Sequence, residues 1–301
     1  MYPQQFYSHG KLLLTGEYLV LDGAKALALP CKLGQSLKAD KISSQKFEWK
    51  SYLKNGKFWK SCEFDVSDMT ESNYKNDFEK RLFEILNVIY QLKPHLFKDE
   101  LRFTTQLEFE KNWGLGSSST LIYNLSQWAG IDAYFLLDKT FGGSGYDIAA
   151  ANMNSPFFFQ RKNNKVDVEE TEIDEKIKPY IYFLYLNKKQ NSREGISRYR
   201  QKRIDNKDIQ AISLISEKLS MESDINEFEI SIKKHENIVS SIIGIEPVHS
   251  RLFPDYKSGV VKSLGAWGGD FVLVTACKRE DLHYFEEKGY DVIYNYKDLV
   301  F

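Results

Sequence analysis

The chain of 301 residues carries 41 Lys and Arg against 42 Asp and Glu, so its formal net charge is −1. Such a balance provides no long-range field that would favour nucleic acid or an anionic membrane, and we expect neither as a partner. The 3 cysteines are odd in number, widely spaced and without a CxxC pair, which argues against a disulfide framework and a zinc site. Because no stretch approaches the roughly 18 apolar residues of a membrane helix, and the first residues lack a signal-peptide run, we expect a cytoplasmic protein.

The first part of the chain shows mainly strand signals, followed by one clear helix. Residues 11–20 are apolar and β-prone on both sides of Gly16, which predicts two strands meeting at a bend. Aromatic-rich segments follow between residues 33 and 64, where Asn55 and Gly56 form a strong hairpin signal, so we expect a β-meander. Apolar side chains at helical spacing predict a helix over residues 77–92, which ends before Pro94.

A strand, a loop of small residues and a helix come next. Residues 101–109 alternate in the way that is typical of a strand. A loop rich in glycine and serine occupies residues 114–119, and it leads into an apolar helix that we expect to end at Gly130. This order of elements is typical of a loop that presents its backbone to a ligand.

The rest of the chain predicts a second α+β unit. Residues 157–160 and 180–186 have the composition of buried strands and are separated by a charged stretch at residues 161–178. We therefore place a domain boundary near residue 174. Helices are expected over residues 208–219 and 226–243, and an apolar strand over residues 271–276.

The loop WGLGSSST is the first candidate site. Its glycines allow backbone amides to approach a ligand closely, and a helix beginning at its serines would direct unpaired amides and a positive dipole end at a phosphate. The alternative is an ordinary loop in which serine or threonine caps the helix. The sequence contains no GxxxxGK[ST], and the GxG at Gly114 lacks the third glycine of the dinucleotide fingerprint.

Three further segments combine charge with small or apolar residues. In GGSGYDIA, Asp147 follows a flexible turn and could accept a hydroxyl proton, orient a nucleophile or bind a metal; the alternative is an N-cap or turn residue. In GKLLLTGE, Lys11 and Glu17 are set among apolar residues, where each charge needs a partner, unless the Lys11 ammonium reaches water at a strand end. The glycine-rich segment at residues 264–270 could approach a ligand or form a tight turn.

Taken in order, these segments resemble the signature regions of the GHMP kinases, the superfamily of galactokinase, homoserine kinase, mevalonate kinase and phosphomevalonate kinase. GKLLLTGEYLVLDGAKALALP resembles the first region, GLGSSST the phosphate-binding second, GSGYDIAAA the segment with the catalytic aspartate, and GAWGGD the glycine-rich third. The resemblance extends from about residue 8 to residue 275, and between the motifs it is one of pattern only. The second region is the most specific.

The resemblance implies a two-domain α+β fold and an ATP-dependent kinase. Residues 1–174 would form an ATP-binding domain similar to the second domain of ribosomal protein S5, and residues 175–301 a ferredoxin-like domain, with the active site between them. The cofactors would be ATP and Mg²⁺. The implied site residues are Asp147 and Lys11 side by side for catalysis; Gly114, Leu115, Gly116, Ser117, Ser118 and Ser119 for the phosphates, with Ser118 also on Mg²⁺; Glu17, Tyr18, Ser144, Gly145 and Lys189 for the substrate; and Gly265, Ala266, Gly268 and Gly269 in the third motif.

The acceptor is predicted less sharply. GEY in the first region and GSGYDIAAA look more like phosphomevalonate kinase than mevalonate kinase, which implies a step of isoprenoid biosynthesis, a small anionic substrate and a monomer or homodimer. Such an acceptor needs basic side chains, for which Lys188, Lys189, Arg193 and Arg198 are candidates, although they could equally decorate a solvated loop. The alternatives are a kinase of another alcohol or sugar and a non-catalytic nucleotide-binding relative.

Two departures from the family pattern bear on the site. Leu136 occupies the position where mevalonate kinases have a metal-binding glutamate, and Asp138 is out of register, so the second metal ligand is open. Trp267 and Asp270 stand in the third region where the family usually has small residues, which leaves the path of that loop open.

Overall fold

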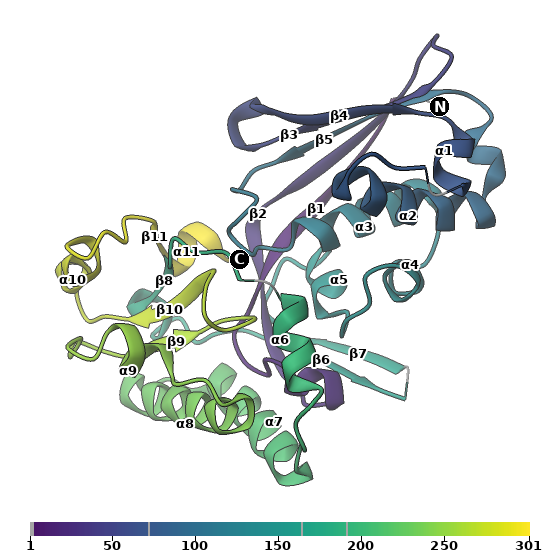
Figure 1. Cartoon of the computed structure of the whole chain (residues 1–301). Helices are drawn as coiled ribbons and strands as arrows, with labels where there is room; N and C mark the ends of the chain where they lie inside the picture. The colour runs from purple at the N-terminus through teal and green to yellow at the C-terminus, as the bar shows by residue number, and fades with distance from the viewer. Residues whose placement is uncertain (1–2, 72, 164, 191) are drawn as a thin grey trace. The chain divides into compact units, whose positions relative to one another are not determined.

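The computed structural model describes residues 3–301 apart from residues 72, 164 and 191, with nothing described for the side chains of residues 192 and 193. Figure 1 shows the course of the chain. The strands are β1 Gln4–Leu13, β2 Ala26–Lys41, β3 Phe47–Tyr52, β4 Phe58–Phe64, β5 Leu101–Leu107, β6 Phe157–Lys162, β7 Lys165–Glu170, β8 Ile181–Tyr185, β9 Val261–Ser263, β10 Phe271–Thr275 and β11 Ile293–Asn295. The α-helices are α1 Val66–Thr70, α2 Asp77–Leu92, α3 Ser117–Ala129, α4 Ala133–Lys139, α5 Tyr146–Ala150, α6 Ser192–Tyr199, α7 Asn206–Met221, α8 Ile225–Ile243, α9 Val248–Leu252, α10 His283–Glu286 and α11 Tyr296–Leu299.

The chain forms two compact units that alternate along the sequence. The first comprises Met1–Gly10, Leu33–Lys111 and Gly116–Asn152, and the second Lys11–Lys32, Asn112–Leu115 and Met153–Phe301. The boundary expected near residue 174 falls inside the second unit, between β7 and β8. The α+β class expected from the sequence is confirmed.

In the first unit, the strands form one layer and the helices form the other. β3 and β4 form an antiparallel hairpin, β3 runs parallel to β5, and β5 pairs antiparallel with residues 35–41 of β2. The hairpin turn has positive φ at Asn55 (61°) and Gly56 (75°), the conformation for which Asn-Gly is favoured, so the predicted hairpin is confirmed. The meander prediction is wrong in one respect: β5, which comes later in the chain, lies between β2 and β3.

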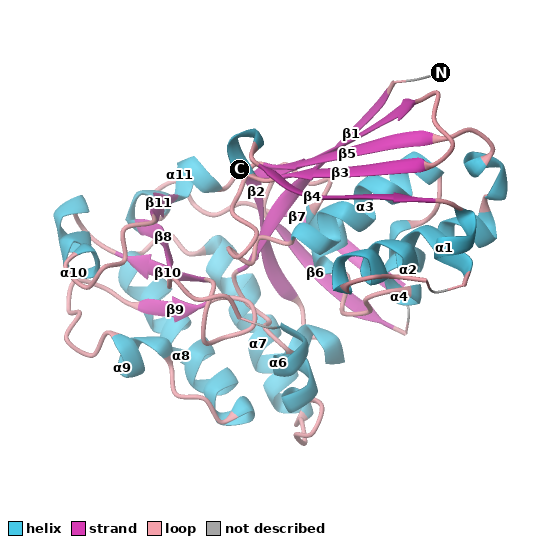
Figure 2. Ribbon diagram, turned by 45° about the horizontal axis from the view of Figure 1, so that its top comes forward, coloured by secondary structure: helices cyan, strands magenta, loops and turns pink. Residues whose placement is uncertain are grey.

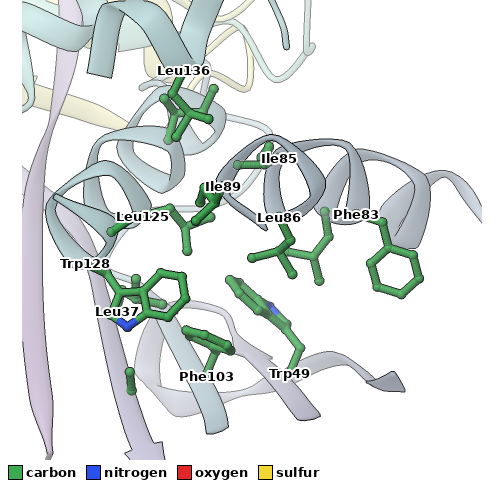
Figure 3. Close-up of a cluster of buried hydrophobic side chains, with 14 of the residues drawn as sticks. Leu37, Trp49, Phe83, Ile85, Leu86, Ile89, Phe103, Leu125, Trp128 and Leu136 are labelled. Atoms are coloured by element: carbon green, nitrogen blue, oxygen red, sulfur yellow. The ribbon is translucent and has the colours of Figure 1, made fainter. Parts of the chain in front are cut away.

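The core of the first unit lies between this sheet and the helices α2, α3 and α4. Ile85, Leu86 and Ile89 of α2 are fully buried, as the helical spacing predicted, and α2 has the predicted bounds Asp77–Leu92. Figure 3 shows them with Leu125 and Trp128 of α3 above the strand residues Trp49 and Phe103. Trp128 stacks edge-on against Phe103 at 4.8 Å between ring centroids. Burying each such side chain contributes roughly 1.5–3 kcal/mol, and this packing holds α2 and α3 against the sheet.

In the second unit, β2 pairs through residues 26–28 with β6, which pairs with β7, and a separate antiparallel sheet has the order β11-β8-β10-β9. The predicted helices are confirmed as α7 and α8, which pack against each other (Figures 1 and 2). The predicted buried strands are confirmed as β6, β8 and β10. Strand β7 was not predicted, because its side chains are mostly exposed and charged and so lack an apolar pattern. Within the described residues, no helix is both long enough and apolar enough to cross a membrane.

The prediction of a second strand after Gly16 is wrong. Residues 19–22 form a short 3₁₀ helix, because the backbone turns through positive φ at Gly16 (87°) and again at Tyr18 (65°). The Cβ of Ala26 would lie 2.6 Å from a side chain added at Gly16, so only glycine fits this close approach. Leu19 and Val20 are nevertheless buried, which explains why the segment has the apolarity of a strand.

Candidate active site

Helix α3 begins differently from the chain's other long helices. Its N-cap is Gly116, in the left-handed conformation with φ 92°, and among the described residues no side chain caps the helix by hydrogen bonding. By contrast, Asn76 caps α2, Asp205 caps α7 and Asp224 caps α8. The alternative of an ordinary side-chain-capped loop is therefore wrong for this segment. The first amides of α3 lie where an anion could accept their hydrogen bonds.

The serines of this loop have distinct environments in the first unit. Ser118 is exposed in the first turn of α3, whereas Ser119 is buried and its hydroxyl donates to the Gly116 carbonyl at 2.9 Å. Thr120 is also buried and donates to Gln35 Oε1 at 2.7 Å. Ser118 is thus the most exposed of these hydroxyls, while Ser117 is half-buried.

The first half of the loop lies in the second unit, against Lys11. The Lys11 backbone amide donates to the Leu115 carbonyl at 3.0 Å, and Lys11 Nζ donates to the Gly114 carbonyl at 2.9 Å. The ammonium is half-buried, so the alternative of a lysine wholly in water is wrong. The structure therefore joins the first motif to the beginning of the phosphate-loop motif.

Asp270 of the third motif faces the same loop residue. A Cβ added at Gly114, whose φ is 72°, would lie 2.3 Å from Asp270 Oδ2. Asp270 Oδ1 accepts the Gln190 amide at 3.0 Å. Burial raises the pKa of Asp270, while the Gln190 amide and the charges of Lys11 and Lys189 oppose that rise. The sequence analysis noted Asp270 only as a departure from the third family motif. A carboxylate in a glycine-rich segment was the signal that could have identified it as a candidate site residue.

Asp147 lies in the first turn of α5 in the first unit. The N-cap of α5 is Gly145, in the left-handed conformation at φ 91°, so the alternative of Asp147 as the N-cap is wrong. Asp147 is half-buried, and its Oδ1 accepts the Ile148 amide at 3.2 Å. Ser144 and Gly145 before it are buried. Asp147 and Lys11 belong to different units, so their predicted adjacency stays a prediction.

Glu17 is the centre of a buried ionisable cluster in the second unit. Its carboxylate has no exposed surface and forms an ion pair with the equally buried Lys262, and His235 Nε2 lies 3.1 Å from Glu17 Oε2. Burial opposes ionisation of Glu17, but Lys262 and His235 hold its pKa below the ordinary value. Burial lowers the pKa of His235. Glu17 therefore has its charge partner inside the protein, and it offers a substrate no exposed atom.

Tyr18 connects the first motif to the third. Its hydroxyl donates to the Ala266 carbonyl at 2.6 Å, and its ring stacks on Tyr199 with centroids 5.5 Å apart. Trp267 is buried in the same hydrophobic cluster as both tyrosines, which accounts for the bulky residue in this glycine-rich motif. Gly265 and Gly268 have positive φ, and a Cβ at Gly269 would lie 2.6 Å from the Lys188 carbonyl. The third motif is thus a tight turn held by the first.

Several solved structures with this architecture are kinases of small molecules. The chain superposes on Methanococcus jannaschii mevalonate kinase with a TM-score of 0.66 at 16% identity, covering 98% of both chains. It superposes on Streptococcus pneumoniae phosphomevalonate kinase, solved with phosphomevalonate and AMPPNP, with a TM-score of 0.69 at 13% identity and coverage of 97% and 99%. It superposes on Lactococcus lactis galactokinase, solved with galactose, with a TM-score of 0.70 at 14% identity, covering 97% of this chain and 92% of the galactokinase.

The chain has the GHMP kinase fold. No family model matches the sequence, and no curated protein matches it either. At 13–16% identity the likeness establishes the fold alone, and relatives acting on mevalonate, phosphomevalonate and galactose all share it.

Within the GHMP kinase fold of this chain, three of the basic candidates for the substrate are on the surface. Lys188, Lys189 and Arg198 are exposed, and the side chain of Arg193 lies outside the described part of the structure. The described residues contain no group of three or more His, Cys, Asp or Glu that could hold a metal by itself. Mg²⁺ at a nucleotide typically takes one or two protein ligands and completes its shell with phosphates and water, so an exposed hydroxyl such as that of Ser118 fits the requirement.

Proposed function

We propose that this protein is an ATP-dependent small-molecule kinase. The observation that carries the proposal is the start of α3: a left-handed glycine and three serines open a long helix that no described side chain caps. This arrangement suits a polyphosphate, because unpaired amides and the positive helix end both favour anions. The fold supports it, since a structure of the same fold was solved with the ATP analogue AMPPNP.

In the proposed mechanism, the amides at residues 116–119 bind the phosphates, and Ser118 is the hydroxyl placed to hold Mg²⁺. When bound, Mg²⁺ neutralises charge on the β- and γ-phosphates. Asp147 accepts the proton of the attacking hydroxyl or orients the attacking oxygen, and Lys11 offsets negative charge on the transferred group. Asp270, beside Gly114, needs a proton or a nearby cation when phosphates occupy the loop, and the raised pKa of its carboxyl agrees with that demand.

Glu17 and Tyr18 act in this proposal as positioning residues. Their polar atoms contact Lys262 and the Ala266 carbonyl, both in the second unit. Through these contacts, the first motif keeps its turn and the third motif keeps its glycines in place. Ser144, Gly145 and the exposed Lys189 remain the proposed substrate contacts.

For the acceptor, we propose phosphomevalonate ahead of mevalonate. GEY at residues 16–18 and GSGYDIAAA at residues 143–151 are the supporting residues. The second candidate function is a kinase of a sugar or another alcohol, which the comparable superposition on galactokinase favours. A third, a non-catalytic nucleotide-binding relative, is favoured by Leu136 at the position of the family's metal-binding glutamate.

A coupled ADP-release assay tests the proposal directly. Purified protein is given Mg²⁺ and ATP with phosphomevalonate, mevalonate, galactose or homoserine in parallel. We expect turnover on one acceptor and a fall of at least about 10³-fold in kcat in Asp147→Asn, because the amide neither accepts a proton nor carries charge. Asp167→Asn, at an exposed carboxylate of β7 outside all four motifs, is the matched control and should keep activity within about twofold.

The outcomes separate the candidates. Turnover on galactose alone would contradict the proposed isoprenoid acceptor but support the proposed kinase activity. Binding of AMPPNP without turnover on any acceptor would favour the non-catalytic relative. Full activity in Asp147→Asn would remove Asp147 from the mechanism.

A further inference from the structure

Three hydrogen bonds within the second unit hold Asp270, the last residue of the third motif. The Asp270 amide donates to the Lys188 carbonyl at 2.6 Å, and the Leu186 amide donates to the Asp270 carbonyl at 2.8 Å. The Gln190 amide donates to Oδ1 of the carboxylate at 3.0 Å. Asp270 has φ 57°, a left-handed conformation that is uncommon outside glycine and persists where the surrounding structure imposes it. The carboxylate is therefore kept in one place.

That place is beside the first glycine of the phosphate-loop motif. A Cβ added at Gly114 would lie 2.3 Å from Asp270 Oδ2 and 2.4 Å from its Cγ, so the carboxylate fills the space of a side chain at this position. Gly114 precedes Gly116, the N-cap of α3, by two residues, and Cα atoms with this separation are at most about 7.6 Å apart. Asp270 thus borders the loop to which we assign the phosphates.

One oxygen of this carboxylate is available to a ligand. Among the residues that the structure describes, none forms a hydrogen bond or an ion pair with Oδ2, and this oxygen does not belong to the fully buried unpartnered atoms. Lys11, whose positive charge acts on Asp270, donates its Nζ hydrogen bond to the Gly114 carbonyl at 2.9 Å. An unshared carboxylate oxygen suits Mg²⁺, which prefers oxygen ligands.

A bound polyphosphate brings like charge to this carboxylate. For unit charges about 5 Å apart near a protein surface, such repulsion weakens binding on the order of 100-fold. A divalent cation coordinated by oxygens of both groups removes the repulsion, and Mg²⁺ at nucleotides is commonly held by one or two carboxylates together with phosphates. The described residues contain no group of three or more His, Cys, Asp or Glu that could hold a metal by itself. The single carboxylate beside the loop therefore fits a metal ion that is shared with the nucleotide.

We propose that Asp270 is the carboxylate ligand of the nucleotide's metal ion, and that its Oδ2 makes nucleotide binding depend on a divalent cation. The inference rests on the proposed kinase function and names a metal ligand for that site. It makes Asp270 a residue of specificity, because the loop then accepts a nucleoside polyphosphate with its cation and rejects the same molecule without it.

Asparagine at this position separates the metal from a purely structural role. In Asp270→Asn the side-chain oxygen still accepts the Gln190 amide, so the turn is kept while the negative charge is lost. A second variant, Asp270→Gly, suits the φ of 57° and removes the carboxylate altogether. Asp255→Asn is the matched control, because it removes one exposed carboxylate of the same unit outside the four motifs.

Isothermal titration of the full chain with AMPPNP at pH 8, in excess Mg²⁺ and again in EDTA, tests the inference. We expect the unmodified chain to bind at least about 100-fold more tightly with Mg²⁺. In Asp270→Asn and Asp270→Gly this ratio should fall below about tenfold, because metal-free AMPPNP binds more tightly than to the unmodified chain and the Mg²⁺ complex binds less tightly. Asp255→Asn should keep the ratio within about twofold.

Mn²⁺ gives a second readout that involves no turnover. Paramagnetic resonance of free Mn²⁺ measures its affinity for the complex of protein and AMPPNP, which should weaken at least about tenfold in Asp270→Asn and stay within about twofold in Asp255→Asn. Equal AMPPNP affinity in Mg²⁺ and EDTA on the unmodified chain, or an unchanged ratio in both Asp270 variants, would overturn the inference and leave nucleotide binding intact. No AMPPNP binding in either buffer would overturn the proposed function and this inference with it.

Discussion

At the scale of single residues, burial decides which charged groups face a ligand and which hold the fold. Glu17 and Lys262 are fully buried together, and removing either one would leave an uncompensated charge inside the protein. Asp147 and Asp270 are only partly buried, and each lies in a glycine-rich motif. The sequence presents all these residues alike, as charges among apolar or small neighbours, and only burial separates them.

The pH dependence of stability should report the proton on Glu236. Because this residue of α8 is buried, its folded pKa, about 8, is raised above the ordinary value of 4.5, so between these values the folded chain holds a proton that the unfolded chain has lost. Its contribution to stability is therefore greatest below pH 4.5 and falls as pH rises toward 8, by up to about 1.4 kcal/mol per pH unit. Glu236→Gln has no such proton. Denaturant unfolding at pH 5.5, 7 and 8.5 should show the stability advantage of the unmodified chain over Glu236→Gln shrinking with pH, and a constant difference would contradict the assignment.

At the scale of elements, two glycine-initiated helices distinguish the candidate site from the rest of the fold. Helices α3 and α5 both begin after a left-handed glycine, whereas side chains of Asn or Asp cap α2, α4, α7 and α8. A capping side chain would occupy the amides that an anion needs. The missing side-chain cap at α3 therefore costs helix stability, and it leaves the first amides of the helix available to an anionic ligand.

Gly114→Ala should damage the loop more than the backbone conformation alone would explain. An alanine at φ 72° costs about 1–2 kcal/mol, and its Cβ would also meet Asp270 Oδ2 at 2.3 Å. Gly289→Ala is the matched control, because its φ is 82° and a Cβ there meets nothing within 4 Å. We expect AMPPNP affinity to fall at least about tenfold in Gly114→Ala and to stay within about twofold in Gly289→Ala.

The double variant Gly114→Ala/Asp270→Gly completes this test. Asp270 itself has φ 57°, so glycine is tolerated there and removes the clashing carboxylate. A partial recovery of thermal stability relative to Gly114→Ala is expected. Strictly additive losses in this cycle would show that the contact does not operate in solution.

At the scale of the whole molecule, each compact unit is assembled from segments that are far apart in the chain. Residues 11–32 and 112–115 belong with residues 153–301 in the second unit, which brings Lys11, Gly114 and Asp270 together. The phosphate-loop motif is itself divided, with residues 114–115 in the second unit and residues 116–119 in the first. A ligand that engages the whole loop should therefore stabilise both units.

Thermal unfolding with Mg²⁺ and AMPPNP tests this expectation. At about one hundred times its Kd, a ligand adds about 2.7 kcal/mol to the folded state, which corresponds to a rise of roughly 4–10 °C in Tm. Tryptophan fluorescence should show that the unfolding temperature rises in both units, because Trp49 and Trp128 are buried in the first unit and Trp267 is buried in the second. Removing the metal with EDTA should reduce the shift, and an equal shift with and without Mg²⁺ would argue against a metal-dependent site.

Local order in the sequence was enough to determine several elements and the loop of glycines and serines before α3. Helix α2, the helix after the serines, the Asn-Gly hairpin and the strands β5, β8 and β10 follow from spacing and turn chemistry, because these are set by neighbours within a few residues. Tertiary structure alone decided that β5 lies between β2 and β3, that residues 19–22 are helical, that Asp270 faces Gly114 and that Glu236 is buried. These features depend on contacts between residues tens to hundreds of positions apart, for which a local pattern carries no signal.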